Sequence, residues 1–109
     1  MIVGTTPTHT FNLPFDVSNI AVVRVVYSQQ KDKTNKNSKY FPVFVKKNED
    51  CVLENKQVKV TLTQEDTFKF DYELPVKIQL RILTNANNAL ATVPKKIGVT
   101  ECLEEVVIE

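Results

Sequence analysis

The amino-acid sequence predicts an all-β fold, an antiparallel immunoglobulin-like β-sandwich of about seven to eight short strands with one helical turn after Thr63. Apolar and polar residues alternate in one segment after another, which is the period of a half-buried strand. These segments recur at intervals of roughly ten residues, with turn-forming residues between them. No helical period is longer than one turn. The 109 residues fit a single β-sandwich domain spanning 1–109.

The first two predicted strands differ in burial. The segment THTFNLPFD alternates, with His9, Phe11, Leu13 and Phe15 on one side, and Pro14 ends this strand or marks it as a sheet edge. The segment NIAVVRVVYSQ is β-branched almost throughout, and both of its sides are largely apolar. One side carries Ala21, Val23, Val25 and Tyr27, and the other carries Val22, Arg24 and Val26. We expect a central strand that is covered on both sides.

A polar hairpin and its return strand come next. The segment KDKTNKNSK, residues 31–39, contains no apolar residue and is typical of a mobile surface loop. The segment YFPVFVKK then returns as the partner strand, with Tyr40 to Val45 as its apolar body. Pro42 cannot donate a backbone hydrogen bond, so it indicates a sheet edge or a bulge.

The second half of the chain repeats the alternation. A short strand from Cys51 to Leu53 turns at ENKQ into QVKVTLT. The segment PVKIQLRILT gives the clearest strand, and NANN after it favours a turn. The inward-facing residues of these strands are Val58, Val60 and Leu62, then Val76, Ile78, Leu80 and Ile82. ALATVPKKIGVTECL supplies one or two closing strands broken at Pro94.

The segment VTLTQEDTFKF changes from a strand pattern to a helix-start pattern. Thr63, followed three residues later by Asp66, resembles a capping box, and acidic residues suit the first turn of a helix. One helical turn here would carry the chain between the two sheets, with Phe68 and Phe70 closing the end of the core. A solvated loop is the alternative interpretation. The chain has no Trp, so the likeness to an immunoglobulin domain concerns architecture only.

Charge and hydropathy exclude several kinds of partner. Lys and Arg number 14 against 13 Asp and Glu, so the net charge of +1 shows no overall preference for nucleic acid or an anionic membrane. No apolar run approaches the roughly 18 residues of a membrane span, and the first ten residues lack a targeting pattern. We therefore expect a soluble protein. Cys51 and Cys102 are expected to be reduced, packed thiols, with a disulfide as the alternative in an oxidising destination.

The residues needed for catalysis or for cofactor binding are mostly missing. The single histidine, His9, lies on the apolar side of the first strand and is expected to be structural. Two glycines, Gly4 and Gly98, cannot form a glycine-rich phosphate loop, and the usual His and Cys metal sites need several converging ligands. We expect no enzyme activity, no catalytic residue, no cofactor, no metal and no small-molecule ligand.

Two segments are candidates for an interaction surface. Residues 31–47 contain six lysines and one acid. The lysines of the loop at 31–39 could contact phosphates while neighbouring aromatic rings stack on bases. A solubilising loop is the commoner explanation, so nucleic-acid binding is not expected. The terminal segment ECLEEVVIE places apolar residues among four glutamates and could dock as a strand on this or another subunit. The candidate residues are Lys31, Lys33, Lys36, Lys39 and Tyr40 in the loop, and Val106, Val107 and Ile108 in the terminal segment.

Three segments carry a resemblance to a group of small proteins encoded by tailed phages and prophages of gut-associated bacteria. They are TPTHTFNLPFD, VTLTQEDTFKFDYELPVKIQLRILT and ATVPKKIGVTECLEEVV, and residues 31–39 are the least typical part of the chain. The resemblance implies a phage-encoded β-sandwich without an active site. It would be a capsid, neck or tail component, or an assembly accessory, that contacts other virion or assembly proteins, including copies of itself.

Two function classes therefore remain open. The first is a non-enzymatic virion protein, located in the virion or in the host bacterial cytoplasm during assembly. The second is a small phage-encoded inhibitor that binds a host protein, because a cofactor-free domain of 109 residues suits that role equally well. A carbohydrate-binding sandwich is a weaker third class, since the chain has no Trp to form a sugar-binding platform.

Overall fold

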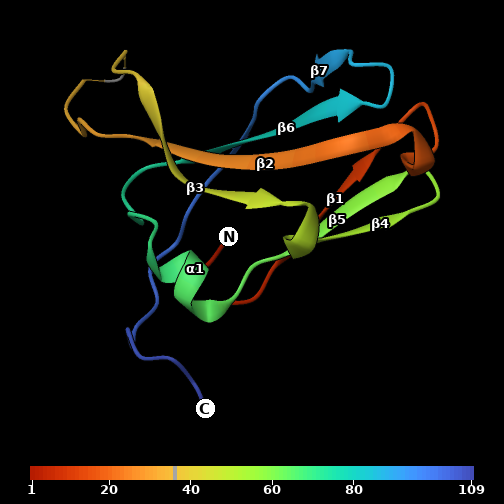
Figure 1. Ribbon diagram of the computed structural model, residues 1–109. Helices are drawn as coiled ribbons and strands as arrows, with labels where there is room; N and C mark the ends of the chain where they lie inside the picture. The colour runs from red at the N-terminus through yellow and green to blue at the C-terminus, as the bar shows by residue number, and fades with distance from the viewer. Residues whose placement is uncertain (36) are drawn as a thin grey trace.

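Eight strands form two antiparallel sheets that pack face to face in a computed structural model describing residues 1–35 and 37–109 (Figure 1). The three-stranded sheet has the order β1-β5-β4, with β1 at Thr8–Asn12, β5 at Gln57–Thr61 and β4 at Cys51–Glu54. The five-stranded sheet has the order β3-β2-β6-β7, and β8 also pairs with β6. Its strands are β2 (Ile20–Gln30), β3 (Tyr40–Lys47), β6 (Val76–Thr84), β7 (Ala89–Ala91) and β8 (Lys95–Ile97). The predicted all-β sandwich is confirmed.

The pairing order differs from that of an immunoglobulin domain at one strand. Immunoglobulin constant domains pair strands A, B, E and D in one sheet and C, F and G in the other. Here the second strand in the chain, β2, lies between β3 and β6. It therefore belongs to the sheet opposite to the one that contains strand B of an immunoglobulin domain. β2 and β3 follow each other in the chain and pair as antiparallel neighbours of the five-stranded sheet.

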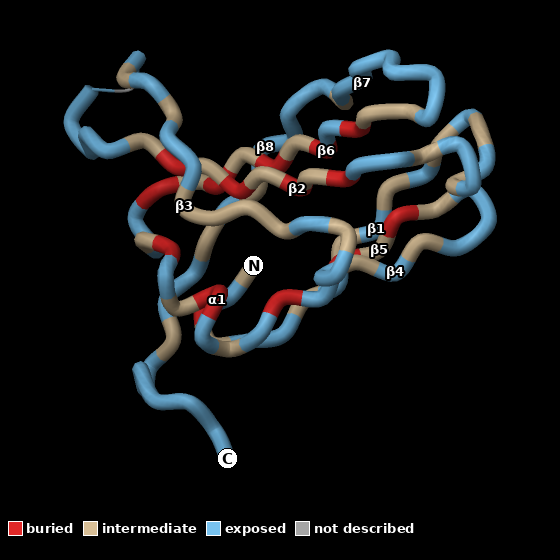
Figure 2. The backbone as a smooth tube through the Cα atoms, in the orientation of Figure 1, coloured by how far each residue is buried: buried red, intermediate tan, exposed pale blue. Residues whose placement is uncertain are grey.

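The core lies between the two sheets and has the predicted residues. Figure 2 shows buried positions along β2, β5 and β6, where the sheets face each other. The three-stranded sheet contributes Val58 and Val60 of β5, and Leu62 follows directly after β5. Strand β6 contributes Val76, Ile78, Leu80 and Ile82. Val23, Val25 and Tyr27 of β2 complete this buried cluster.

The prediction that β2 is covered on both sides is wrong. The face with Val23 and Val25 is fully buried, but Val22 on the opposite face is 41% exposed. The three-stranded sheet covers only the inner side of the five-stranded sheet, so the β-branched residues on the outer side reflect strand propensity instead of burial. This exposed outer side is central to the candidate site below.

The helical turn after Thr63 forms as predicted. α1 (Gln64–Phe68) begins with a complete capping box: the Thr63 hydroxyl accepts from the Asp66 amide at 3.1 Å, and Asp66 accepts from the Thr63 amide at 2.9 Å. α1 connects β5 to β6 and so carries the chain between sheets. Phe70 is buried in the core, while the half-buried Phe68 ring packs over Gly4.

Turn and edge residues also behave as the sequence indicates. β3 is an edge strand, and its register against β2 shifts at the pair after Tyr27, so Pro42 lies at an edge and beside a bulge. Asn55 and Asn87 adopt positive φ in the turns after β4 and β6. Short 3-10 helices precede β2 (η1, Val17–Asn19) and β4 (η2, Asn48–Asp50). Pro94 separates β7 from β8.

Candidate interaction surface on the five-stranded sheet

The loop lysines predicted as a candidate surface do not form one free cluster. Lys33 binds two acids near the end of the α1–β6 connection, with its Nζ 3.0 Å from Asp71 Oδ2 and 2.9 Å from Glu73 Oε2. The Lys31 Nζ lies 4.3 Å from the centre of the Phe41 ring. Lys39 is exposed, and Lys36 lies outside the described residues.

The same ion pairs tie the loop to the body of the protein. Hydrogen bonds to Glu73 and Asp71 raise the pKa of Lys33 above its usual value. Beside them, Gln29 bonds to the backbone of Asp71 and Leu74, which holds the α1–β6 connection against β2. At least one of the candidate cations is therefore neutralised within the chain.

The predicted aromatic partner of the loop faces a different cation. Tyr40 is half-buried, and Lys77 of β6 places its Nζ 4.1 Å from the centre of the Tyr40 ring. Tyr40 therefore adjoins the outer side of the five-stranded sheet, where its cation partner comes from β6 and not from the loop.

The terminal segment projects from the body below α1 and forms no strand within this chain (Figure 1). Its apolar side chains are open to solvent: Val106 is 60%, Val107 37% and Ile108 79% exposed. One contact holds its end. The Gln64 side chain donates to the Ile108 carbonyl at 2.9 Å and accepts from the Ile108 amide at 2.7 Å. In Figure 1 the connection between β2 and β3 lies at the top and the terminal segment at the bottom, so the two candidate segments are far apart.

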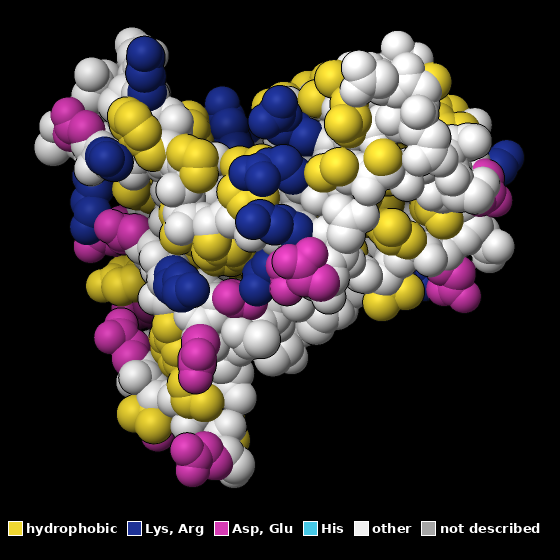
Figure 3. All heavy atoms as spheres, viewed as in Figure 1, with side chains coloured by type: hydrophobic (Ala, Val, Ile, Leu, Met, Phe, Trp, Pro, Cys, Tyr) yellow, Lys and Arg dark blue, Asp and Glu magenta, His cyan; other side chains and the backbone are white. Residues whose placement is uncertain are grey.

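Strand register brings together three cations that sequence reasoning treated separately. Arg24 of β2 is directly opposite Lys47 of β3 on one side and Arg81 of β6 on the other. Directly paired residues point to the same face, so the three side chains form a line across the outer side of the sheet. We call Lys47, Arg24 and Arg81 the basic row. Figure 3 shows Lys and Arg side chains gathered in a line over β6, β2 and β3.

The basic row is electrostatically unsatisfied within the described part of the chain. The ion pairs there involve Lys33 and Lys46, and none involves a member of the row. Two unit charges about 5 Å apart in water repel by about 0.8 kcal/mol. Like charges directly opposite on neighbouring strands accordingly destabilise a sheet. The row thus costs the folded chain some stability, and a bound carboxylate would offset that cost.

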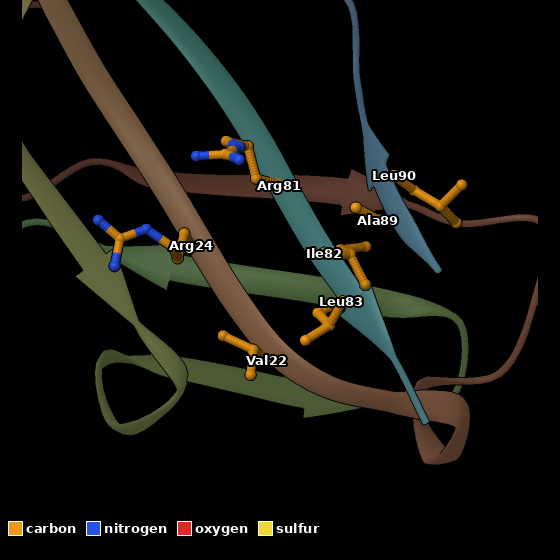
Figure 4. A pocket seen from close by; sticks show the side chains of 7 residues that line it. All are labelled: Val22, Arg24, Arg81, Ile82, Leu83, Ala89 and Leu90. Carbon is orange, nitrogen blue, oxygen red and sulfur yellow. The ribbon is translucent and has the colours of Figure 1, made fainter. Parts of the chain in front are cut away.

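Apolar residues flank the basic row on both sides. The pair Val22 and Leu83 lies on one side. The pair Val26 and Val45 lies on the other, where Gln79 of β6 completes the rank and donates to the Thr92 carbonyl. Figure 4 shows Val22 and Leu83 side by side, with the guanidinium groups of Arg24 and Arg81 extending toward β3. A shallow depression of about 240 Å³ opens where these side chains meet Ala89 and Leu90 of β7.

A second pair of cations lies beyond the apolar pair Val26 and Val45. Lys77 of β6 is opposite Lys96 of β8, in line with Ser28 of β2. The outer side of the sheet therefore alternates between apolar and basic ranks along the strand direction. We call this surface the outer face; its residues are Val22, Leu83, the basic row, Val26, Val45, Lys77 and Lys96.

His9 is a half-buried partner of the core. Its Nδ1 lies 2.8 Å from the Tyr27 hydroxyl, and the two ring centres are 5.6 Å apart. Burial lowers the pKa of His9, and burial raises the pKa of Tyr27. Both groups are therefore held neutral near pH 7, and the pair satisfies a buried hydroxyl. Cys51 and Cys102 are free, half-buried thiols.

Residues 1–35 and 37–109 contain no group of three His, Cys, Asp or Glu side chains placed to hold a metal ion. In the same residues, no helix has the length and apolar character needed to span a membrane. The chain matches no protein-family model, no curated protein and no solved structure.

Sequence reasoning missed the basic row because the signal is spread over three strands. Arg24 interrupts VVRVV and Arg81 interrupts LRIL, each at a position that alternation predicts to point outward. Alternation assigns each cation to a face of its own strand but does not say which residues lie opposite one another. Pairing β2 directly with β6 supplies that information.

Proposed function

We propose that this chain is a non-enzymatic structural or accessory component of a tailed-phage particle, in the capsid, neck or tail, and that it acts through protein–protein contacts. The phage assignment rests on the sequence resemblance. The contact function is supported by one structural observation, the partly exposed outer face, whose basic row lies between apolar residues and makes no ion pair within the described residues. Charge and apolar area together are typical of a surface that binds another protein.

A protein partner suits this surface better than a nucleic acid does. Nucleic-acid sites favour aligned cations with exposed aromatic rings that stack on bases. On the outer face the residues beside the cations are aliphatic except for Gln79, and Lys77 lies over the nearby Tyr40 ring. Aliphatic side chains next to cations match a partner segment that alternates apolar and acidic residues.

Mass spectrometry of purified phage particles tests the proposed function. The chain is expected among the particle proteins at a constant ratio to a known capsid or tail component. Its absence from particles, together with expression early in infection, would refute the proposal and favour an inhibitor of a host protein. A purified host protein retained by the immobilised chain would then identify that target.

A further inference from the structure

We propose that the outer face binds the terminal segment, residues 101–109, of a second copy of this chain. The inference rests on the proposed function and specifies its first partner. It joins two features whose charges have no ion-pair partner in the described structure: a partly exposed basic sheet face, and an acidic, apolar segment whose end is held by Gln64. Each feature has the chemistry that the other lacks.

Charge complementarity is the first argument. The terminal segment contains four glutamates and no basic residue. The outer face carries the three cations of the basic row, followed by Lys77 and Lys96. Within the described residues, Glu49 and Asp50 of η2 follow Lys47 along the chain, at one end of the row. The segment and the face therefore attract each other across most of their length.

The spacing of residues is the second argument. In an extended chain, alternate side chains point to one side and repeat about every 6.6 to 6.8 Å. One side of the extended segment would carry acids and apolar residues in strict alternation: Glu101, Leu103, Glu105, Val107 and Glu109. The outer face alternates apolar and basic ranks along β2 with the same two-residue repeat. The opposite side of the segment includes only one glutamate and lacks this match.

These two patterns give one register. Leu103 packs on the rank of Val22 and Leu83, and Glu105 then lies over the basic row. Val107 follows on the rank of Val26 and Val45, and Glu109 reaches Lys77 and Lys96. Leu103 is 98% exposed in the single chain, so docking would remove a large apolar side chain from water.

The resulting contact joins two different surfaces. The segment of one copy meets the face of the next, and the face of the first copy stays open for a third. Such a heterologous contact builds rings or open arrays instead of a closed two-fold dimer. Repeated subunits of a phage particle need a contact of this kind. Docking releases the hydrogen bonds between Gln64 and Ile108, which are exposed.

A charge-swap experiment on the full chain tests the contact. The face variant combines Arg24→Glu with Arg81→Glu, and the segment variant is Glu105→Lys, at the position that the register places over the basic row. Each variant alone brings together like charges, so self-association is expected to weaken at least tenfold. An equimolar mixture restores opposite charges at both possible contacts and is expected to form hetero-complexes. Sedimentation velocity at increasing protein concentration measures each case.

Controls separate the contact from misfolding and from general charge effects. The control variant Lys56→Glu with Lys59→Glu reverses two cations of the three-stranded sheet region and is expected to associate like the wild type. Circular dichroism should show the same β spectrum for every variant, since the face variant keeps one like-charge pair across β2 and β6 and makes the pair across β2 and β3 oppositely charged. Raising NaCl from about 50 to 500 mM should weaken wild-type association at least tenfold.

The inference is overturned by a wild-type chain that stays monomeric, by variants that associate like the wild type, or by a mixture that does not assemble. Its failure is distinguishable from failure of the proposed function. A monomeric chain that is nevertheless present in purified particles removes the self-contact and leaves the particle role standing. A chain that assembles but is absent from particles keeps the self-contact and removes the particle role.

Discussion

Replacing Asp66 by Asn should destabilise the protein by roughly 2 kcal/mol at neutral pH, because it removes the charged partner of the half-buried Lys46. Asp66 Oδ2 lies 2.8 Å from Lys46 Nζ, and the two side chains are 9% and 18% exposed. A hydrogen bond to a charged group contributes about 1.5 to 3 kcal/mol. Asn keeps an oxygen for the Thr63 amide, so the cap survives and only the charged contact is lost. Asp66→Ala should cost about 1 kcal/mol more through the lost cap.

The pH dependence of this difference has a definite sign. Burial alone would raise the pKa of Asp66, but the hydrogen bonds from Lys46 and Thr63 outweigh it and lower the pKa below its usual value. A lowered folded-state pKa stabilises the fold above the unfolded value of about 4. This contribution is lost as the pH falls through the folded-state pKa. The difference between wild type and Asp66→Asn should thus be constant from pH 7 to about pH 5 and shrink below about pH 4.

Urea unfolding followed by far-ultraviolet circular dichroism measures these differences. Glu65→Gln removes an exposed acid from the same helical turn and should change the unfolding free energy by less than about 0.5 kcal/mol. A double-mutant cycle with Lys46→Gln should assign most of the Asp66→Asn loss to the pair. Equal effects of Asp66→Asn and Glu65→Gln would refute the reasoning.

Three further predictions concern the core, a strained glycine and the loop. Leu80→Ala should lower the free energy of unfolding in urea by about 2 to 5 kcal/mol, because Leu80 is fully buried. The same substitution at the exposed Leu103 should lower it by less than about 0.5 kcal/mol. Equal losses would mean that the buried and exposed faces are assigned wrongly. Gly4→Ala should lower the unfolding free energy by about 1 to 3 kcal/mol, because Gly4 has φ +79° and its Cβ would lie 2.6 Å from the α1 ring packed on it; Gly98→Ala meets nothing within 4 Å, so an equal loss there would contradict the explanation. Replacing residues 31–39 by an Asn-Gly turn should change stability by less than about 1 kcal/mol, since the two ion pairs that it removes, of Lys33 with Asp71 and with Glu73, are largely exposed. Salt-sensitive DNA binding lost on trimming would instead show a nucleic-acid role for the loop.

Local pattern was sufficient for the strands, and it was not sufficient for their neighbours. The alternation in PVKIQLRILT identifies a strand and its buried face, because residues two positions apart in a strand point to the same side and here these residues are apolar. The capping letters at Thr63 and Asp66 predicted α1 because they act on backbone groups within four residues. Interactions within one segment can be predicted from that segment alone.

Coverage and pairing depend on other segments, and there the sequence was less informative. The β-branched sequence of β2 predicts burial on both faces, but a strand in a two-layer sandwich has one face that the other sheet does not reach. The ion pairs of Lys33 could not be foreseen, because Asp71 and Glu73 lie some forty residues further along the chain. The basic row needed the β2–β6 register for the same reason.

Nuclear magnetic resonance of the full chain tests the self-contact most directly. A ¹⁵N-labelled sample is diluted, and the amide shifts that change with protein concentration are mapped. Changes are expected in two places at once: on β2 and β6 around Arg24 and Arg81, and in the terminal segment around Glu105 and Val107. Shifts that do not change with concentration, or changes confined to the open edge of β3, would contradict docking of the segment on the outer face.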